Sequence, residues 1–279
     1  MFNGVLKWQH YAAVWKQARV ISLLKDPALP SSYRPISVLD TVEKLFEKTL
    51  LSRIMAEINS RGRLRNGQFG FRPGLSTTLQ LARLAESVKR NFDEKRLTGA
   101  VFLGVAKAFD SVWIKGLLLK LTILEFPSYL VKLITSYLHS RTFVAAFQAA
   151  TSSCRLMRAG VAQGGVISPV LFSLYVNNIP TPSPHIELAQ YADDTPLVAT
   201  SKHPAHLVKY LETLLSELEI WLREWRIAND VGKSAAVIFT TRRIPPPRPL
   251  RFLGEEIRWG KKSNIWASPW IGDLPGVVT

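Results

Sequence analysis

The chain has 279 residues, of which 47% are hydrophobic and 20% are charged. This balance excludes a disordered protein, and the length is enough to bury a core in one large domain or two smaller ones. The 36 Lys and Arg outnumber the 21 Asp and Glu, which leaves a net charge of +15 at pH 7. A surplus of this size favours a polyanionic partner, with nucleic acid preferred over an anionic membrane.

The sequence lacks signals for a membrane or an oxidising compartment. No apolar stretch reaches the roughly 18 residues that a membrane-spanning helix needs, and the N-terminus lacks the pattern of a signal peptide. Cys154 is the only cysteine, so an intrachain disulfide and a thiolate metal cluster are excluded. We therefore expect an intracellular protein, nuclear or cytoplasmic, without a membrane or disulfide partner. Its oligomeric state is left open.

The N-terminal part of the chain is predicted to be mainly helical. An aromatic-rich helix should lead into a strand at 20–24. Apolar residues then recur at three- and four-residue steps over 39–58, which predicts a long helix capped by Asp40 or Thr41. The same spacing predicts a second amphipathic helix over 77–92.

Strands and helices are predicted to alternate in the remainder of the chain. The apolar run 100–105 is short enough to be a buried strand, and Pro169 suits the first turn of a helix that begins at Ser168. Further helices are predicted at 114–124, 128–138 and 207–225, and further strands at 143–147, 156–161 and 235–240.

Two adjacent carboxylates, Asp193 and Asp194, lie between the apolar stretches 186–190 and 197–200. This pattern predicts a β-hairpin whose tight turn carries both acids, where neighbouring side chains can approach one region. Two close carboxylates repel each other unless a cation or a donor offsets them, and Mg²⁺ favours one or two carboxylates plus substrate phosphates. An isolated Asp-Asp pair is more often an ordinary solvated turn. The other motifs of this chain favour the metal-binding interpretation.

Several segments together resemble one protein family. They are Trp15-Lys16-Gln17-Ala18, Ser32-Tyr33-Arg34-Pro35-Ile36-Ser37, Lys44-Leu45-Phe46-Glu47-Lys48, Gln68-Phe69-Gly70-Phe71-Arg72, Ala108-Phe109-Asp110-Ser111-Val112-Trp113, Gly160-Val161-Ala162-Gln163-Gly164, Ser168-Pro169-Val170-Leu171-Phe172, the Tyr191 hairpin, and Trp225-Arg226-Ile227 with Lys233-Ser234. In this order and spacing, the chain resembles the reverse transcriptase domain of non-LTR (LINE-type) retrotransposons, in particular the Jockey-like elements of insects. The resemblance extends from residue 1 to about residue 260.

The resemblance implies an α+β fold of the right-hand polymerase type. It implies a fingers-like region at 1–98 and a palm-like region at 99–260, with a catalytic hairpin at 186–200. The palm sheet should be mixed, mainly antiparallel and backed by helices, and no thumb is expected within the chain. The activity implied is RNA-directed DNA synthesis from an RNA template, a DNA primer and deoxynucleoside triphosphates. Two Mg²⁺ ions would stabilise the attacking and leaving oxygens of the in-line displacement.

The resemblance also implies roles for individual residues. Asp193 and Asp194 match the catalytic, metal-binding pair. Gln163 and Gly164 match residues near the incoming nucleotide and the template, where a glycine permits close approach of the backbone. Phe109 matches the aromatic residue beneath the sugar.

Two basic residues match the groups of the fingers that contact the triphosphate. They are Arg34, whose planar fork suits phosphate oxygens, and Lys25. Taken alone, Phe109 is more often a core residue and Arg34 a solvated surface charge. The shared register of the motifs favours the functional roles.

The strand before Phe109 departs from the family pattern. It should carry a third metal-binding aspartate but reads Leu103-Gly104-Val105. Asp110 lies about 20 Å further along an extended strand, so we interpret it as closing a turn and capping the next helix. Loss of the acid at 104 is expected to cost about 4 kcal/mol of transition-state stabilisation, roughly a thousandfold in rate. Two milder departures are Pro196 in the strand after the acidic turn and Gly165 in place of the usual serine.

The C-terminal segment departs more sharply from the family. Where a Lys-Tyr-Leu-Gly-Val hairpin that grips the primer is expected, residues 264–276 differ, but regrouping their permitted codons in a neighbouring frame yields Tyr-Leu-Gly-Val. We therefore hypothesise that 261–279 is an out-of-frame, disordered tail. The coding DNA decides this hypothesis.

Three functions remain open at this point. The chain could be an active reverse transcriptase in which another acid completes the site. It could be a non-catalytic basic relic of the same fold that binds nucleic acid, or a basic module unrelated to polymerases. The ordered motifs disfavour the last, and the glycine at 104 favours the inactive, degenerate copy.

Overall fold

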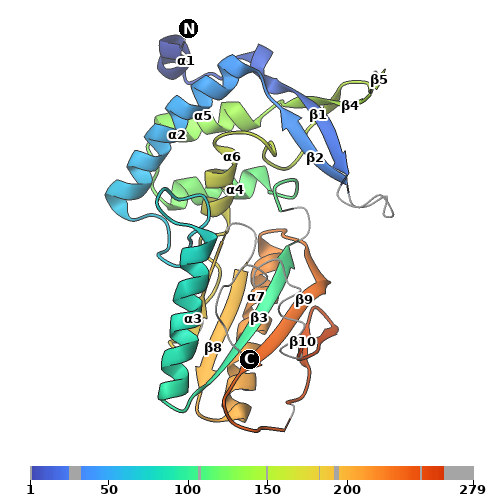
Figure 1. Ribbon diagram of the computed structural model, residues 1–279. Coiled ribbons are helices and arrows are strands. Elements are labelled where there is room, and N and C mark those ends of the chain that lie inside the picture. The colour runs from blue at the N-terminus through green and yellow to red at the C-terminus, as the bar shows by residue number, and fades with distance from the viewer. Residues whose placement is uncertain are drawn as a thin grey trace. The chain divides into compact units, whose positions relative to one another are not determined.

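The chain forms two compact units, each built from two separate stretches of sequence (Figure 1). The first unit combines Met1–Leu64 with Lys107–Val176, and the second combines Arg65–Ala106 with Asn177–Thr279. The assignment of a fingers-like region to 1–98 and a palm-like region to 99–260 stays a prediction. The computed structural model describes residues 2–24, 33–105, 108–148, 150–181, 183–191, 195–245 and 247–260.

The first unit contains a mixed five-stranded sheet. Strand β1 pairs antiparallel with β2 and parallel with β4, whose other partners are β5 and β6. The strands are β1 (Gln17–Leu24), β2 (Tyr33–Val38), β4 (Thr142–Phe147), β5 (Ala150–Thr151) and β6 (Arg155–Leu156). The helical elements of this unit are α1 (Phe2–Trp8), η1 (Ala13–Lys16), α2 (Thr41–Arg61), α4 (Ile114–Ile123), α5 (Ser128–Leu138) and α6 (Ser168–Tyr175).

Helix α2 confirms the predicted helix over 39–58, with Asp40 as its N-cap. The side chain of Asp40 accepts hydrogen bonds from the backbone N–H groups of Val42 and Glu43. The buried face differs from a purely apolar one, because Glu43 and Glu47 are fully buried whereas Leu45 is 56% exposed. Helix α2 therefore carries two carboxylates into the interior of the first unit.

Aromatic side chains form the core around these carboxylates. The rings of Tyr11, Trp15 and Phe46 contact one another, with centroids 5.4 to 5.8 Å apart. Tyr137 of α5 meets Tyr11 edge to face at 5.0 Å. Edge-to-face pairs of this kind add to the apolar area that the rings bury.

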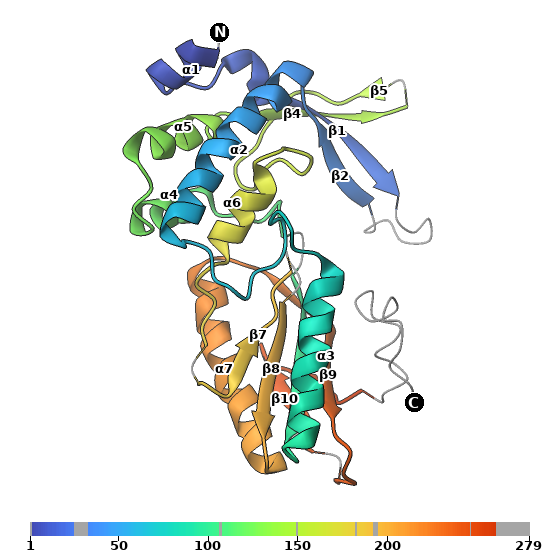
Figure 2. The same ribbon diagram turned by 60° about the vertical axis from the view of Figure 1, so that its left-hand side comes forward.

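The second unit is a four-stranded antiparallel sheet with strand order β7-β8-β3-β9. Two helices cover its opposite faces (Figure 2). A Cβ at Gly99 would meet Leu207 and Leu211 of α7. Side chains alternate along a strand, so the side chain of the preceding Thr98 points to the opposite face, where its hydroxyl accepts a hydrogen bond from Asn91 of α3. The elements are α3 (Thr77–Asp93), β3 (Leu97–Val105), β7 (Ile186–Leu188), β8 (Thr195–Ser201), α7 (Pro204–Glu224), β9 (Asn229–Phe239), β10 (Leu250–Phe252) and β11 (Glu255–Ile257).

The predicted hairpin at 186–200 is confirmed for the residues that the structure describes. Strands β7 and β8 pair antiparallel, with Ile186 opposite Ala199. Pro196 lies in β8, between β7 and β3, and its carbonyl accepts the Ala189 N–H at 3.0 Å. A proline cannot return such a bond, so the ladder lacks one donor near the end of the hairpin.

Most other predicted elements are confirmed, and one strand is wrong. The helices predicted at 77–92, 114–124, 128–138 and 207–225 are α3, α4, α5 and α7. The strand predicted over 156–161 reduces to Arg155–Leu156, because Leu156 pairs with Thr142, the first residue of β4, and the residues after it have no part of β4 opposite them. None of the helices in the described part of the chain is long and apolar enough to cross a membrane. The tail at 261–279 lies outside the described residues.

Candidate functional site

Gly104 lies near the end of β3, the strand in which the third acid was expected. It pairs with Asp230 of β9, next to a shift in register between Phe102 and Gly104. A Cβ at residue 104 would lie 2.8 Å from the Cβ of Lys233. Because Cβ atoms do not approach so closely, β9 would have to move before any side chain could occupy this position.

Lys233 and Asp230 form an ion pair beside Gly104. Their side chains are 2.7 Å apart, and the hydrogen bond from Lys233 lowers the pKa of Asp230 below its usual value. Residues 231–234 of β9 stand opposite the single residue Leu103 of β3, so β9 bulges here. The bulge brings Lys233 over the place where the side chain of an acid would project.

The predicted metal-binding pair, Asp193 and Asp194, lies outside the described residues. Among the residues that the structure describes, no three His, Cys, Asp or Glu side chains gather closely enough to hold a metal ion. The expected third position carries no oxygen ligand, because it is Gly104. The described residues therefore do not fit a metal held by three carboxylates.

Gln163 and Gly164 form a tight contact with the end of β2 in the first unit. The carbonyl of Gln163 accepts the Ser37 N–H at 2.7 Å. Gly164 has a φ of +113°, and a Cβ there would lie 2.5 Å from the Ser37 carbonyl oxygen. Only glycine fits this conformation and this spacing against β2. The predicted position of Gly164 near an incoming nucleotide stays a prediction.

Phe109 is held beside the same loop by backbone hydrogen bonds. Its carbonyl accepts the Val161 N–H at 2.8 Å, and its ring stacks on Phe172 of α6 at 5.2 Å. Gly160 lies against the turn at Asp110, where a Cβ would be 2.8 Å from the carbonyl oxygen. The structure thus brings the turn of Phe109 to the loop of Gln163, two segments that are far apart in sequence.

Asp110 lies in the predicted turn. Helix α4 begins at Ile114, and its N-cap residue is Trp113. The N-cap position predicted for Asp110 is therefore occupied by Trp113, three residues further along the chain.

Arg34 and Lys25 are the two basic residues predicted to contact phosphate. Lys25 lies outside the described residues. The backbone of Arg34 lies in β2 opposite Leu23. The phosphate-binding role of both residues stays a prediction.

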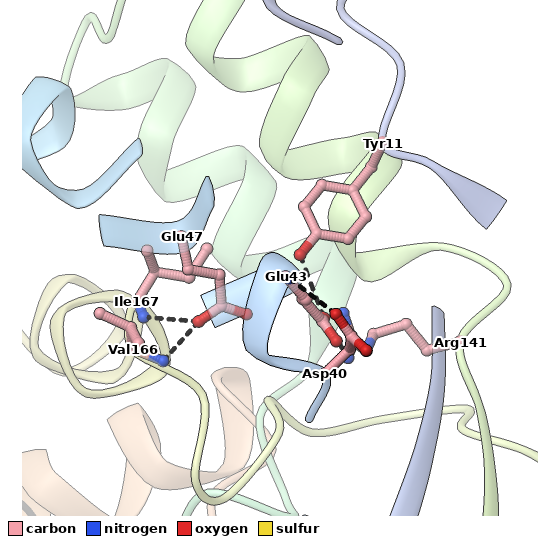
Figure 3. A network of polar contacts seen from close by, with 7 residues as sticks. All are labelled: Tyr11, Asp40, Glu43, Glu47, Arg141, Val166 and Ile167. Carbon is pink, nitrogen blue, oxygen red and sulfur yellow. Dashed lines mark hydrogen bonds and ion pairs between the residues drawn. The ribbon is translucent and has the colours of Figure 1, made fainter. Parts of the chain in front are cut away.

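A buried polar network adjoins the loop of residues 163–167, and none of the sequence motifs indicates it (Figure 3). The Oε1 atom of Glu43 accepts hydrogen bonds from the Tyr11 hydroxyl and the Arg141 guanidinium, both at 3.0 Å. Burial raises the pKa of Glu43, and the charge of Arg141 opposes that shift. Burial alone would lower the pKa of Arg141, but Tyr137, Glu43 and Tyr11 together raise it.

Glu47 lies one helical turn further along α2 and contacts the loop itself. Its Oε2 atom accepts the backbone N–H groups of Val166 and of Ile167, the latter at 3.2 Å (Figure 3). Burial raises the pKa of Glu47, and these two N–H groups oppose the shift. The spacing of Glu43 and Glu47 with Leu50, Ile54 and Ile58, at three- and four-residue steps, was the signal that could have placed both carboxylates inside.

Comparison with protein families gives a match over residues 23–257 to the family described as "Reverse transcriptase (RNA-dependent DNA polymerase)". Among curated relatives, the probable RNA-directed DNA polymerase from transposon BS of Drosophila melanogaster is 34% identical over 88% of this chain. The RNA-directed DNA polymerase from mobile element jockey of the same fly is 32% identical over 87%. The chain spans only 28% and 27% of the length of these two relatives.

Solved structures share the fold. Apo telomerase from Candida tropicalis, truncated from the C-terminal domain, matches with a TM-score of 0.60 and 12% identity, over 92% of this chain and 57% of that chain. Telomerase from Candida tropicalis in complex with a fragment of telomeric RNA matches with a TM-score of 0.60 and 11% identity, over 92% of this chain and 46% of that chain. These structures confirm the predicted α+β polymerase-like fold.

Proposed function

Because this chain belongs to the reverse transcriptase (RNA-dependent DNA polymerase) family, we propose that it retains a nucleotide-facing surface while its own catalysis is disabled at residue 104. The substrates of the ancestral reaction are an RNA template, a DNA primer and deoxynucleoside triphosphates. The observation that carries the loss of catalysis is the glycine in β3, with the Cβ of Lys233 packed over it.

The nucleotide-facing surface consists of Phe109, Gln163 and Gly164. Two contacts support this assignment: the backbone bond from Val161 to Phe109 and the fit of Gly164 against Ser37. A ring held by stacking on Phe172 can support the sugar of a nucleotide from below. Arg34 and Lys25 would supply positive charge to the triphosphate.

Metal dependence is a property of this enzyme family, and Mg²⁺ is the ion we propose for it. Asp193 and Asp194 would hold the ion, and its chemistry would be the stabilisation of charge on the reacting phosphate oxygens. A two-metal site needs carboxylates from neighbouring strands, and Gly104 supplies none.

RNA-templated incorporation of labelled deoxynucleotide tests the loss of catalysis. The unaltered chain, supplied with Mg²⁺ and a primed RNA template, should incorporate nucleotide at a rate about a thousandfold below that of an active relative, from the roughly 4 kcal/mol of lost stabilisation. Incorporation within about tenfold of the relative would show that another group completes the site.

A second candidate function is nucleic-acid binding without catalysis. The observation that favours it is the net charge of +15, which does not depend on the metal site. Under this alternative the chain binds RNA or primed RNA but does not select among deoxynucleoside triphosphates.

A further inference from the structure

Glu47 is a fully buried carboxylate of α2, and it accepts hydrogen bonds from the loop that carries the nucleotide-facing glycine. Its two partners, Val166 and Ile167, follow Gln163 and Gly164 in the chain and lead directly into α6. Bonds from N–H groups to an ionised acceptor are stronger than neutral ones. A carboxylate is also favoured at the N-terminal end of a helix, where the helix dipole is positive.

The loop is held at its other end by β2. The Ser37 N–H donates to the Gln163 carbonyl at 2.7 Å, and Gly164 fits against the Ser37 carbonyl oxygen. Between these two anchors the Gly165 N–H donates to the Ala162 carbonyl at 2.9 Å, which closes a turn. The backbone of Gly164 is therefore fixed from both sides, by β2 and by Glu47.

We propose that Glu47 is a positioning residue that sets the backbone of the Gln163–Ile167 loop for an incoming deoxynucleoside triphosphate. Glu47 acts through Val166 and Ile167 and does not touch the nucleotide. This inference rests on the proposed nucleotide-facing surface. It identifies Glu47 of α2 as the residue that holds the loop of that surface in place. Without Glu47, the two N–H groups lose their acceptor in the interior of the first unit, and the segment between Gly164 and α6 is free to shift.

Glu43 supplies a matched control for this proposal. It lies on the same face of α2, is equally buried, and also accepts two hydrogen bonds. Its partners are Tyr11 and Arg141, which lie outside the loop. A purely structural role for Glu47 would make the two carboxylates equivalent in their effect on the loop.

The test compares Glu47→Gln, Glu47→Ala and Glu43→Gln in the full chain. Hydrogen exchange would be measured at the backbone amides of Val166 and Ile167 relative to those of α5, together with the affinity for a fluorescent deoxynucleoside triphosphate. Glu47→Ala should speed exchange at the two amides at least tenfold relative to α5 and weaken nucleotide binding about tenfold. Glu47→Gln should give an intermediate effect, since its amide oxygen still accepts but carries no charge.

The Glu43→Gln variant should lower overall stability without changing the exchange ratio or the nucleotide affinity. Equal changes in the ratio for Glu43→Gln and Glu47→Gln would overturn the proposal, as would faster exchange without any loss of affinity. If the unaltered chain binds no nucleotide, the proposed nucleotide-facing surface fails by itself. The exchange ratio then decides alone whether Glu47 anchors the loop.

Discussion

At the scale of single residues, the stability of the first unit depends on a buried ion pair between Glu43 and Arg141. Glu43 is fully buried and Arg141 is 2% exposed, and their side chains are 3.0 Å apart. Removing one partner of such a pair leaves an uncompensated charge in the interior, whereas removing both leaves none. Stability should therefore respond very differently to single and double replacement.

We predict that Glu43→Leu or Arg141→Leu alone lowers the free energy of unfolding by about 3–5 kcal/mol. The double variant should cost less than either single variant, because it buries no unpaired charge. Urea denaturation of the four proteins measures this coupling. Simple additivity of the two single effects would contradict the inferred pairing.

Lys120 is a second buried charge, and its effect depends on pH. It is 4% exposed, donates to the Tyr175 carbonyl, and has a pKa that burial lowers to about 7. Between pH 7 and the ordinary value of 10.5 the unfolded chain binds a proton that the folded chain does not. Stability should therefore rise with pH in this window, by at most about 1.4 kcal/mol per pH unit.

Replacing Lys120 with methionine tests this linkage while keeping an apolar stem. The free energy of unfolding of the unaltered chain should rise from pH 7 to pH 9 relative to that of Lys120→Met, and the two curves should run parallel below pH 6. Burial raises the pKa values of Tyr11 and Tyr137 above their usual range, which affects both proteins equally and only near pH 10. Parallel curves throughout would show that Lys120 is not deprotonated in the folded chain.

At the scale of elements, β3 and β9 are packed together too closely for a side chain at residue 104. We predict that Gly104→Ala lowers stability by about 1–3 kcal/mol through overpacking against Lys233. In a Lys233→Gly background the same replacement should cost much less, because the clashing Cβ is gone. A double-mutant cycle from thermal unfolding measures this coupling, and a coupling energy of zero would contradict the close packing.

The elements also show what local sequence patterns can and cannot specify. The helical period identified α2 correctly, but counting apolar residues favours Leu45 for the core. Glu43 and Glu47 are buried instead, because their partners, Arg141 for Glu43 and the loop N–H groups for Glu47, are distant in sequence. The β10–β11 hairpin was missed because its turn uses Leu253 and Gly254, both at positive φ. Asparagine or aspartate before glycine is the usual signal for such a turn, and leucine at that position does not predict one.

At the scale of the whole molecule, charge predicts a polyanionic partner. Binding of single-stranded RNA and of a primed RNA template should weaken steeply with salt, since lysine and arginine displace counterions from phosphates. A chain with six or more phosphate contacts should lose about a thousandfold in affinity between 50 and 200 mM salt. Titration at several salt concentrations gives the slope. Salt-insensitive binding, or none at low salt, would contradict the prediction.

The candidate site was predictable to the extent that it consists of short motifs. Phe109, Gln163 and Gly164 were identified from sequence, and the structure brings their segments together through Val161 and Ser37. Helical spacing could have placed Glu47 inside, but its bonds to Val166 and Ile167 join residues far apart in sequence, so no local pattern contained them. The crowding at Gly104 likewise depends on the bulge of β9, which sets the position of Lys233.

We propose that catalysis by this reverse transcriptase domain is disabled at residue 104. Primer extension on an RNA template with Mg²⁺ tests it most directly, comparing the unaltered chain with Gly104→Asp and with Gly104→Asp combined with Lys233→Gly. The added Lys233→Gly replacement removes the Cβ that would collide with the new side chain at residue 104. We predict that at least one of the two variants extends the primer about a thousandfold faster than the unaltered chain. Extension by the unaltered chain at a rate equal to that of the variants would contradict the claim.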